Sequence, residues 1–148
     1  MVRSIAATLA FVLSALPTSA DVVEVAAAGT VSETADRLEA AIGDAGATVF
    51  ARVNHGAGAA SVDMDLTDAE LVVFGNPRLG TPALQQDIHA GLVLPLRVLV
   101  YADDDGQTWL AYESVDAMFE DLEIAQDAGF RDVMAGALDR LTAAASGN

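Results

Sequence analysis

The sequence has no cysteine and no lysine among its 148 residues. Without cysteine the chain forms no disulfide, offers no thiolate to a metal ion and has no cysteine nucleophile. All seven basic residues are arginines, against 22 acidic residues, and the formal net charge is −15. Such a surface repels nucleic acid and anionic membranes, and no basic patch with interleaved aromatic residues is present. The composition therefore predicts no nucleic-acid partner.

The first twenty residues have the pattern of a secretory signal. Arg3 supplies a positive start, Ile5 to Leu16 an apolar core, and Thr18 to Ala20 a small-residue cleavage site. This apolar run is too short to cross a bilayer, and no later stretch of suitable length lacks charges. We therefore expect residues 1–20 to be a signal peptide. Residues 21–148 are expected to form a single domain that is periplasmic or secreted and does not span a membrane.

The stretch from Leu71 to Pro82 (LVVFGNPRLGTP) is the most informative part of the sequence. Its first four residues are apolar and predict a strand covered on both faces. Gly75 and Asn76 tolerate positive φ and favour a turn, and Thr81 before a proline is a helix-start signal with threonine as the cap. Gly75 to Thr81 is therefore predicted to be a loop whose amides favour an anion or a substrate carbonyl.

This predicted loop lacks both glycine-rich nucleotide fingerprints, G-x-G-x-x-G and G-x-x-x-x-G-K-[ST], so a nucleotide site is not expected. Arg78 could neutralise an anion or be only solvated. Gly75 and Gly80 could serve only the turn, and Thr81 only the helix cap. The sequence leaves both interpretations open.

The hydrophobic pattern along the chain predicts an α+β fold. We expect a two-layer structure with helices packed on one side of a mixed, mainly antiparallel sheet, in the order β-α-β-β-α-β-β-α-α. Residues 30–33 fit a capping box, and residues 61–70 fit either a strand or a helical turn. The predicted strands are residues 21–28, 48–53, 71–74, 94–101 and 108–113, and the predicted helices are residues 30–43, 82–90, 114–122 and 130–141.

Two of these elements carry more specific expectations. In the strand at residues 48–53, Val49 and Ala51 are expected on one face, and Phe50 on the other. The helix at residues 82–90 is expected to bury Leu84 and Ile88 and to stop at Gly91.

The segment Asn54-His55-Gly56 follows the second strand and is expected to be flexible. A histidine there could titrate, accept a proton or ligate a metal, or be only a polar turn residue. The acidic run that follows does not match a calcium loop, which would need glycine and glutamate where the chain has Asp68 and Phe74. No metal site and no cofactor are predicted.

Four segments together carry a family resemblance: Phe74 to Pro77, Gly80 to Pro82, Leu94 to Val100 and Asp103 to Tyr112. With these motifs in this order, the chain resembles the domain of unknown function 302 family over nearly all of residues 21–148. The resemblance implies a small α+β domain that is often exported and forms a homodimer. It brings no known reaction.

Two histidine positions of that family can be compared with this sequence. His55 matches a histidine that members often carry after the second strand within Asp-His-Ala, where this chain has Asn54-His55-Gly56. A second histidine, often seen in the helix after the last hairpin, is absent, and Glu120, Asp121 and Leu122 stand in that region. The resemblance therefore does not imply a two-histidine metal or haem site here.

These observations favour a non-catalytic module that binds a small anionic or polar ligand. Because both His55 and the Gly75–Thr81 loop follow the C-terminal ends of strands, we expect them to share one hollow. The predicted ligand-binding residues are His55, Gly75, Asn76, Arg78, Gly80 and Thr81.

Two other functions are weighed against this one. The first is a small enzyme that uses His55 as general base at the Gly75–Thr81 loop. It is less favoured because the sequence spells out no nucleophile elbow and no metal triad. The second is a homodimer that binds a basic partner through its acidic face.

Overall fold

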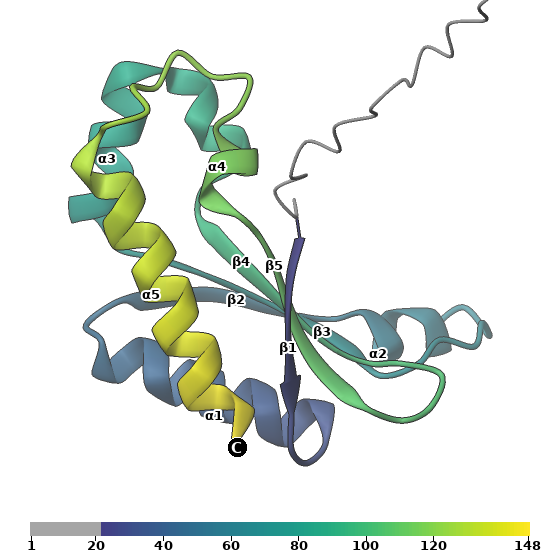
Figure 1. Cartoon of the computed structure of the whole chain (residues 1–148). Helices are drawn as coiled ribbons and strands as arrows, with labels where there is room; N and C mark the ends of the chain where they lie inside the picture. Colours follow the sequence, from purple (N-terminus) through teal and green to yellow (C-terminus); the bar gives the residue numbers. More distant parts are fainter. Residues whose placement is uncertain (1–21) are drawn as a thin grey trace, which may run out of the picture.

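The computed structural model describes residues 22–148, so the predicted signal peptide lies outside the described residues. These residues form a five-stranded sheet in the order β1-β5-β4-β3-β2, with every neighbouring pair antiparallel (Figure 1). The α+β prediction is confirmed, although the sheet is wholly antiparallel instead of mixed. In this part of the chain no helix is long and apolar enough to cross a membrane.

The elements follow the predicted order, with the two short helices α2 and η1 added. The strands are β1 (Val22–Ala27), β2 (Thr48–Asn54), β3 (Ala69–Gly75), β4 (Leu96–Ala102) and β5 (Thr108–Glu113). The α-helices are α1 (Val31–Asp44), α2 (His55–Ala60), α3 (Pro77–Gln86), α4 (Val115–Met118) and α5 (Gly129–Ser146), and η1 (Ile88–Leu92) is a 3-10 helix.

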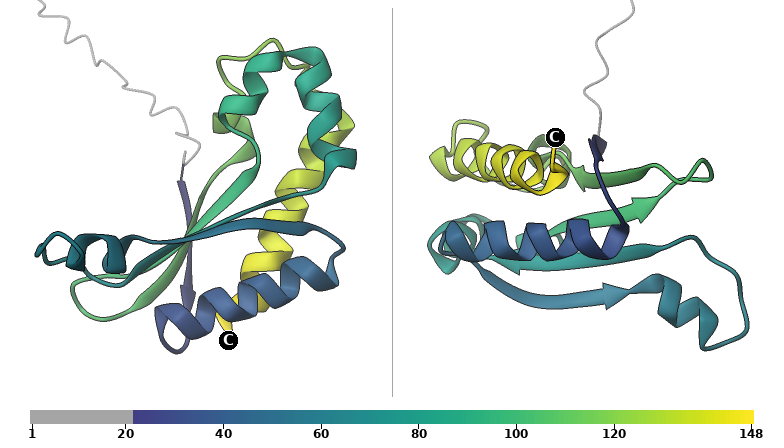
Figure 2. Two further views of the ribbon diagram at one scale, coloured as in Figure 1. Left: turned by 180° about the vertical axis from the view of Figure 1, so that it is seen from behind. Right: turned by 90° about the horizontal axis from the view of Figure 1, so that it is seen from below.

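One face of the sheet is covered by α1 and α5, which pack against each other (Figures 1 and 2). The core between them contains Leu38 of α1, Phe74 of β3 and Leu138 of α5, all almost fully buried. The opposite face carries Leu71 and Val73, which are only partly buried. The continuous apolar run of β3 predicted a strand covered on both faces. This prediction is wrong, because only one face of β3 is covered.

The start of α1 is held by the predicted capping box. Oγ1 of Thr30 accepts from the Glu33 amide at 3.3 Å, and a carboxylate oxygen of Glu33 accepts from the Thr30 amide at 2.9 Å. This bond from the Thr30 amide keeps the pKa of the Glu33 carboxyl below its ordinary value. Two amides that have no partner inside the helix are thereby satisfied.

A β-bulge in β2 overturns the expected alternation of its side chains. Val49 pairs with Phe74, whereas Ala51 pairs with Val73, so Val49 and Ala51 lie on opposite faces of the sheet. Phe50 is the extra residue at this bulge and is 56% exposed. A simple period of two cannot anticipate such an insertion, because it shifts every later side chain to the other face.

The predicted helix at residues 82–90 is in fact two elements. Helix α3 ends at Gln86, and Asp87 then caps η1 through a bond from the His89 amide to its side chain at 2.9 Å. This change of direction turns Ile88 outward, where it is 70% exposed instead of buried. Leu84 is partly buried, in agreement with its expected direction.

Replacing a core leucine tests the packing of α1. Leu38 is completely buried, so Leu38→Ala should lower the free energy of unfolding by about 2–5 kcal/mol through lost burial and a residual cavity. The measurement is urea unfolding followed by circular dichroism. The matched control is Leu92→Ala, which removes the same atoms at a site that is 77% exposed. Equal losses in the two variants would contradict the assignment of the core.

Candidate functional site

The segment from Gly75 to Thr81 is the end of β3 followed by the first turns of α3, not a loop. Oδ1 of Asn76 accepts from the Arg78 amide at 2.9 Å. The backbone oxygen of Asn76 accepts from the amides of Leu79 at 2.9 Å and Gly80 at 3.0 Å. These three amides already donate to Asn76 at the start of the helix. The prediction of an anion-binding loop with free amides is therefore wrong.

The helix begins five residues earlier than predicted because the Asn76-Pro77 pair supplies the start. Asn76 has extended backbone geometry (φ −132°, ψ 120°) and acts as the N-cap, and proline occupies the first turn. A proline there loses no hydrogen bond, since the first amides of a helix have no partner within it. Thr81 and Pro82, which were predicted to start the helix, lie within it.

A pocket of about 330 Å³ opens beside α3, at the end of the sheet where β3 finishes and β4 starts. Four of the six predicted site residues line it: Gly75, Asn76, Gly80 and Thr81. Arg78 is exposed and does not contribute to the lining. The other lining residues are Phe50, Pro77, Leu79, Leu84, Gly91, Leu94, Pro95, Leu96 and Met134.

The lining of this pocket is almost wholly apolar. No charged residue contributes to it, and Asn76 and Thr81 are its polar side chains. Within residues 22–148, no hydrogen bond uses Nδ2 of Asn76 or the hydroxyl of Thr81. The pocket therefore combines an apolar wall with two polar groups that remain available to a ligand.

The two glycines of the predicted motif have different roles in this wall. A Cβ on Gly75 would lie 3.3 Å from the ring of Phe50, so glycine lets this ring pack across the strand end. A Cβ on Gly80 would have the Leu94 side chain as its nearest neighbour, at 4.0 Å. Larger side chains at position 80 would therefore extend into the space of the pocket.

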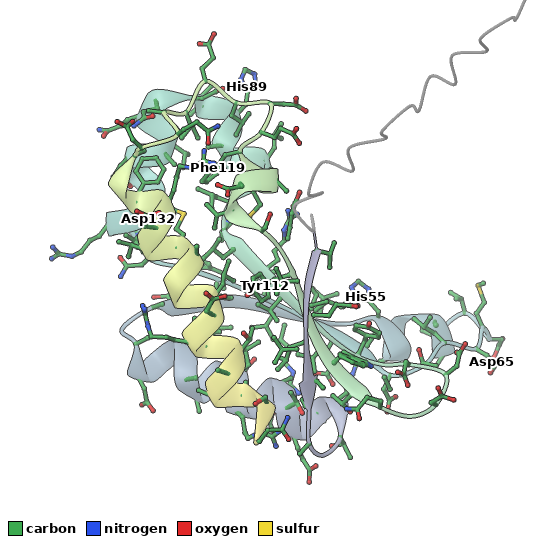
Figure 3. All side chains as sticks on the ribbon, viewed as in Figure 1. His55, Asp65, His89, Tyr112, Phe119 and Asp132 are labelled. Carbon is green, nitrogen blue, oxygen red and sulfur yellow. The ribbon has the colours of Figure 1, made fainter. Side chains whose placement is uncertain are left out.

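The structure does not bring His55 to this pocket. In the β2–β3 ladder Thr48 pairs with Gly75, and Asn54 pairs with Glu70, so His55 follows the opposite end of the ladder (Figure 3). The expectation that His55 and the Gly75–Thr81 segment share one hollow is therefore wrong. The rule that ligands gather at C-terminal strand ends applies to parallel strands, whereas antiparallel neighbours end at opposite edges.

The segment around His55 is also more ordered than expected. It forms helix α2, and Oδ1 of Asn54 caps this helix by accepting from the Ala57 amide at 2.7 Å. His55 is the first residue of α2 and is exposed. In the part of the chain that the structure describes, no group of three histidine or acidic residues is placed to hold a metal ion.

A polar cluster that sequence reasoning missed ties β2 to β3. Glu70 is only 6% exposed, and its two oxygens accept from Arg52 Nε and, at 3.1 Å, from Asn54 Nδ2. Arg52 also bonds Asp36 of α1 at 2.5 Å, and the bond to Glu70 raises the pKa of its guanidinium. Since these donors are already used, the cluster is structural.

A second, polar cavity of about 180 Å³ lies where β5, α4 and α5 meet. Arg131 is 3% exposed, bonds Asp116 at 2.7 Å and lies over the Phe119 ring at 5.6 Å. Tyr112 donates to Asp139 at 2.7 Å, and burial together with this bond raises its pKa to about 12. These two bonds join α4 and β5 to α5. Nη1 of Arg131 is buried and has no hydrogen-bond partner among the described residues.

The model of one protein family, described as "Domain of unknown function DUF302", matches residues 23–147. The chain belongs to this family. A crystal structure of an uncharacterized conserved DUF302 protein from Bacillus stearothermophilus superposes with a TM-score of 0.71 at 19% identity. The similarity covers 86% of this chain and 97% of that one, and it shows that the two proteins share the fold.

Curated relatives match over a shorter segment. The chain is 43% identical over 81 residues to "Fluoride-specific ion channel FluC 1" of Brucella suis biovar 1 (strain 1330), which is 55% of this chain and 32% of that protein. It is equally similar to "Fluoride-specific ion channel FluC 2" of Brucella melitensis biotype 1, covering 30% of that protein. The chain thus spans about a third of the length of these relatives.

The cap of α3 can be tested by changing Asn76. Asn76→Ala removes the acceptor for the Arg78 amide and should lower the free energy of unfolding by about 0.5–2 kcal/mol. Asn76→Asp keeps an acceptor at this position, and its negative charge is favourable at a helix start, so it should retain the stability. Urea unfolding of both variants provides the measurement. If Asn76→Asp were as unstable as Asn76→Ala, the cap would not be the cause.

Proposed function

We propose that this protein is an exported, non-catalytic module that binds a small, mainly apolar molecule in the pocket beside α3. The pocket volume of about 330 Å³ supports this role, because it falls within the range of about 300–1,000 Å³ that is typical of small-molecule sites. Such sites are mostly apolar and contain a few placed polar groups. The signal pattern at residues 1–20 supports a periplasmic or secreted location.

The lining decides the chemical class of the ligand. An anion would require cationic side chains or free amides, and this wall provides neither: Arg78 lies outside it, and the amides at the helix start are bonded to Asn76. The proposed ligand is therefore neutral, with an apolar body and one polar end near Asn76 and Thr81. This replaces the small anionic or polar ligand that the sequence predicted. Fluoride binding is not part of the proposed role, because no cationic side chain lines the pocket.

Binding is favoured over catalysis because no titratable side chain lines this pocket. A general base must come within hydrogen-bond reach of the proton that it removes. His55, the proposed base of the alternative enzyme, follows the far end of the β2–β3 ladder. The hydroxyl of Thr81 has no base beside it among the lining residues, and an unassisted hydroxyl is a weak nucleophile.

Filling the pocket tests this role. Gly80→Leu places a side chain in the pocket and should weaken the binding of the neutral fluorescent probe N-phenyl-1-naphthylamine by about tenfold or more, a loss of about 1.4 kcal/mol. Leucine is favoured over glycine in a helix, so α3 should persist.

The matched control is Gly43→Leu, which adds the same side chain to α1, where a Cβ would meet nothing within 4 Å. It should bind the probe as the unmodified protein does. Absence of saturable probe binding in the unmodified protein, or equal affinity in the two variants, would contradict the proposed site.

A further inference from the structure

We propose that the polar cavity where β5, α4 and α5 meet binds a small zwitterion, a molecule of the free α-amino acid class. In this site Arg131 bonds the carboxylate of the molecule, and Asp132 bonds its ammonium group. The cavity shares no lining residue with the pocket beside α3. The inference therefore goes beyond the proposed function and is tested independently of it.

The cavity has room for a molecule smaller than the one proposed for the pocket beside α3. Its volume of about 180 Å³ is far above the ~10–15 Å³ that one water needs. It is also below the roughly 300 Å³ at which sites for drug-sized ligands begin. Val115, Ala135 and Leu138 supply apolar wall, and Ser114 and Gln126 supply uncharged polar groups. Gln126 is exposed, so the cavity reaches the surface.

The buried guanidinium of Arg131 is the feature that points to a ligand. Its side chain is only 4% exposed, and its hydrogen bond is the one from Nη2 to Asp116 at 2.7 Å. A guanidinium has five N–H donors, and within residues 22–148 Nη1 is buried without a partner. The Phe119 ring stabilises the positive charge but offers no oxygen acceptor. Because a buried donor without an acceptor is destabilising, an oxygen of a bound molecule is the partner that this group lacks.

An acidic side chain without a partner lies next to this arginine in α5. Besides Arg131, the charged residues of the lining are Asp116, Asp132 and Asp139. Asp116 is paired with Arg131, and Asp139 accepts from the Tyr112 hydroxyl at 2.7 Å. Asp132 is exposed near the start of α5 (Figure 3) and forms no ion pair within residues 22–148. The cavity therefore presents one donor and one carboxylate that are both available.

This pair of groups selects a zwitterion over a simple ion. An anion alone would satisfy Arg131, but the carboxylates of the lining would repel it. A cation alone would pair with Asp132 and leave Nη1 of Arg131 without an acceptor. No second cationic residue lines the cavity, and the exposed Glu123 and Asp127 lie on the same loop as Gln126, so an ammonium group is favoured. An α-amino acid carries carboxylate and ammonium on one carbon, which suits two consecutive residues.

Binding of free amino acids to the unmodified protein is the first test. The probes are glycine, L-alanine, L-serine and L-valine, followed by NMR of the backbone amides. At least one should shift the amides of Val115, Arg131 and Ala135 saturably, with a dissociation constant of about 1 mM or lower. The amide of that amino acid lacks the carboxylate, and its N-acetyl form lacks the ammonium group. Each should bind at least about tenfold more weakly.

Two results of this titration would overturn the inference. The first is the absence of a saturable shift with all four probes, which is the result expected if the cavity holds water alone. The second is equal binding of the amino acid and either of its derivatives.

The role of Asp132 is tested by removing its charge. Asp132→Asn keeps the shape of the side chain and should weaken binding of the best probe by about tenfold or more. The matched control is Asp104→Asn, which removes the same charge from an exposed position between β4 and β5 and should leave binding unchanged. Equal affinity in the two variants would overturn the proposed site. Binding of N-phenyl-1-naphthylamine should be the same in both, so failure of the pocket beside α3 is recognised separately.

Discussion

The antiparallel register between β2 and β3 is the constraint on which the rest of this structure depends. Thr48 pairs with Gly75 at one end of the ladder, and Asn54 pairs with Glu70 at the other. Glu70 stabilises the second end, because it is buried and accepts bonds from side chains of β2. A slip by one residue would move this carboxylate to the other face and away from its donors. The register thus fixes the pocket at one end of the ladder and helix α2, which begins at His55, at the other.

Much of the fold could be predicted from local sequence patterns. The strands were recognisable from apolar runs, and the capping box at Thr30 correctly placed the start of α1. Helix α2 was missed because its sequence, HGAGAA, is rich in small residues and has no apolar stripe of helical period. The start of α3 was misplaced because two cap-and-proline signals follow each other, at Asn76-Pro77 and Thr81-Pro82, and the earlier one starts the helix.

The candidate site was only partly predictable, because a pocket is formed by segments that are distant in sequence. Gly75, Asn76, Gly80 and Thr81 were identified from one continuous motif, and they do line the same wall. Phe50 and Met134 were not identified, since the first reaches the pocket through a bulge and the second belongs to α5. The position of His55 depended on strand direction, which local patterns do not encode.

The most direct test of this account is the distance between the two ends of the β2–β3 ladder within one chain. Nitroxide labels on His55→Cys and Thr81→Cys can be measured by pulsed electron paramagnetic resonance, because the chain has no other cysteine. Doubly labelled protein is diluted into an excess of unlabelled protein, so that the signal comes from within one copy. The seven residues of β2 rise about 3.3 Å each, so the account predicts a separation of more than about 20 Å. A single population at less than about 15 Å would contradict the register and, with it, the separation of His55 from the pocket.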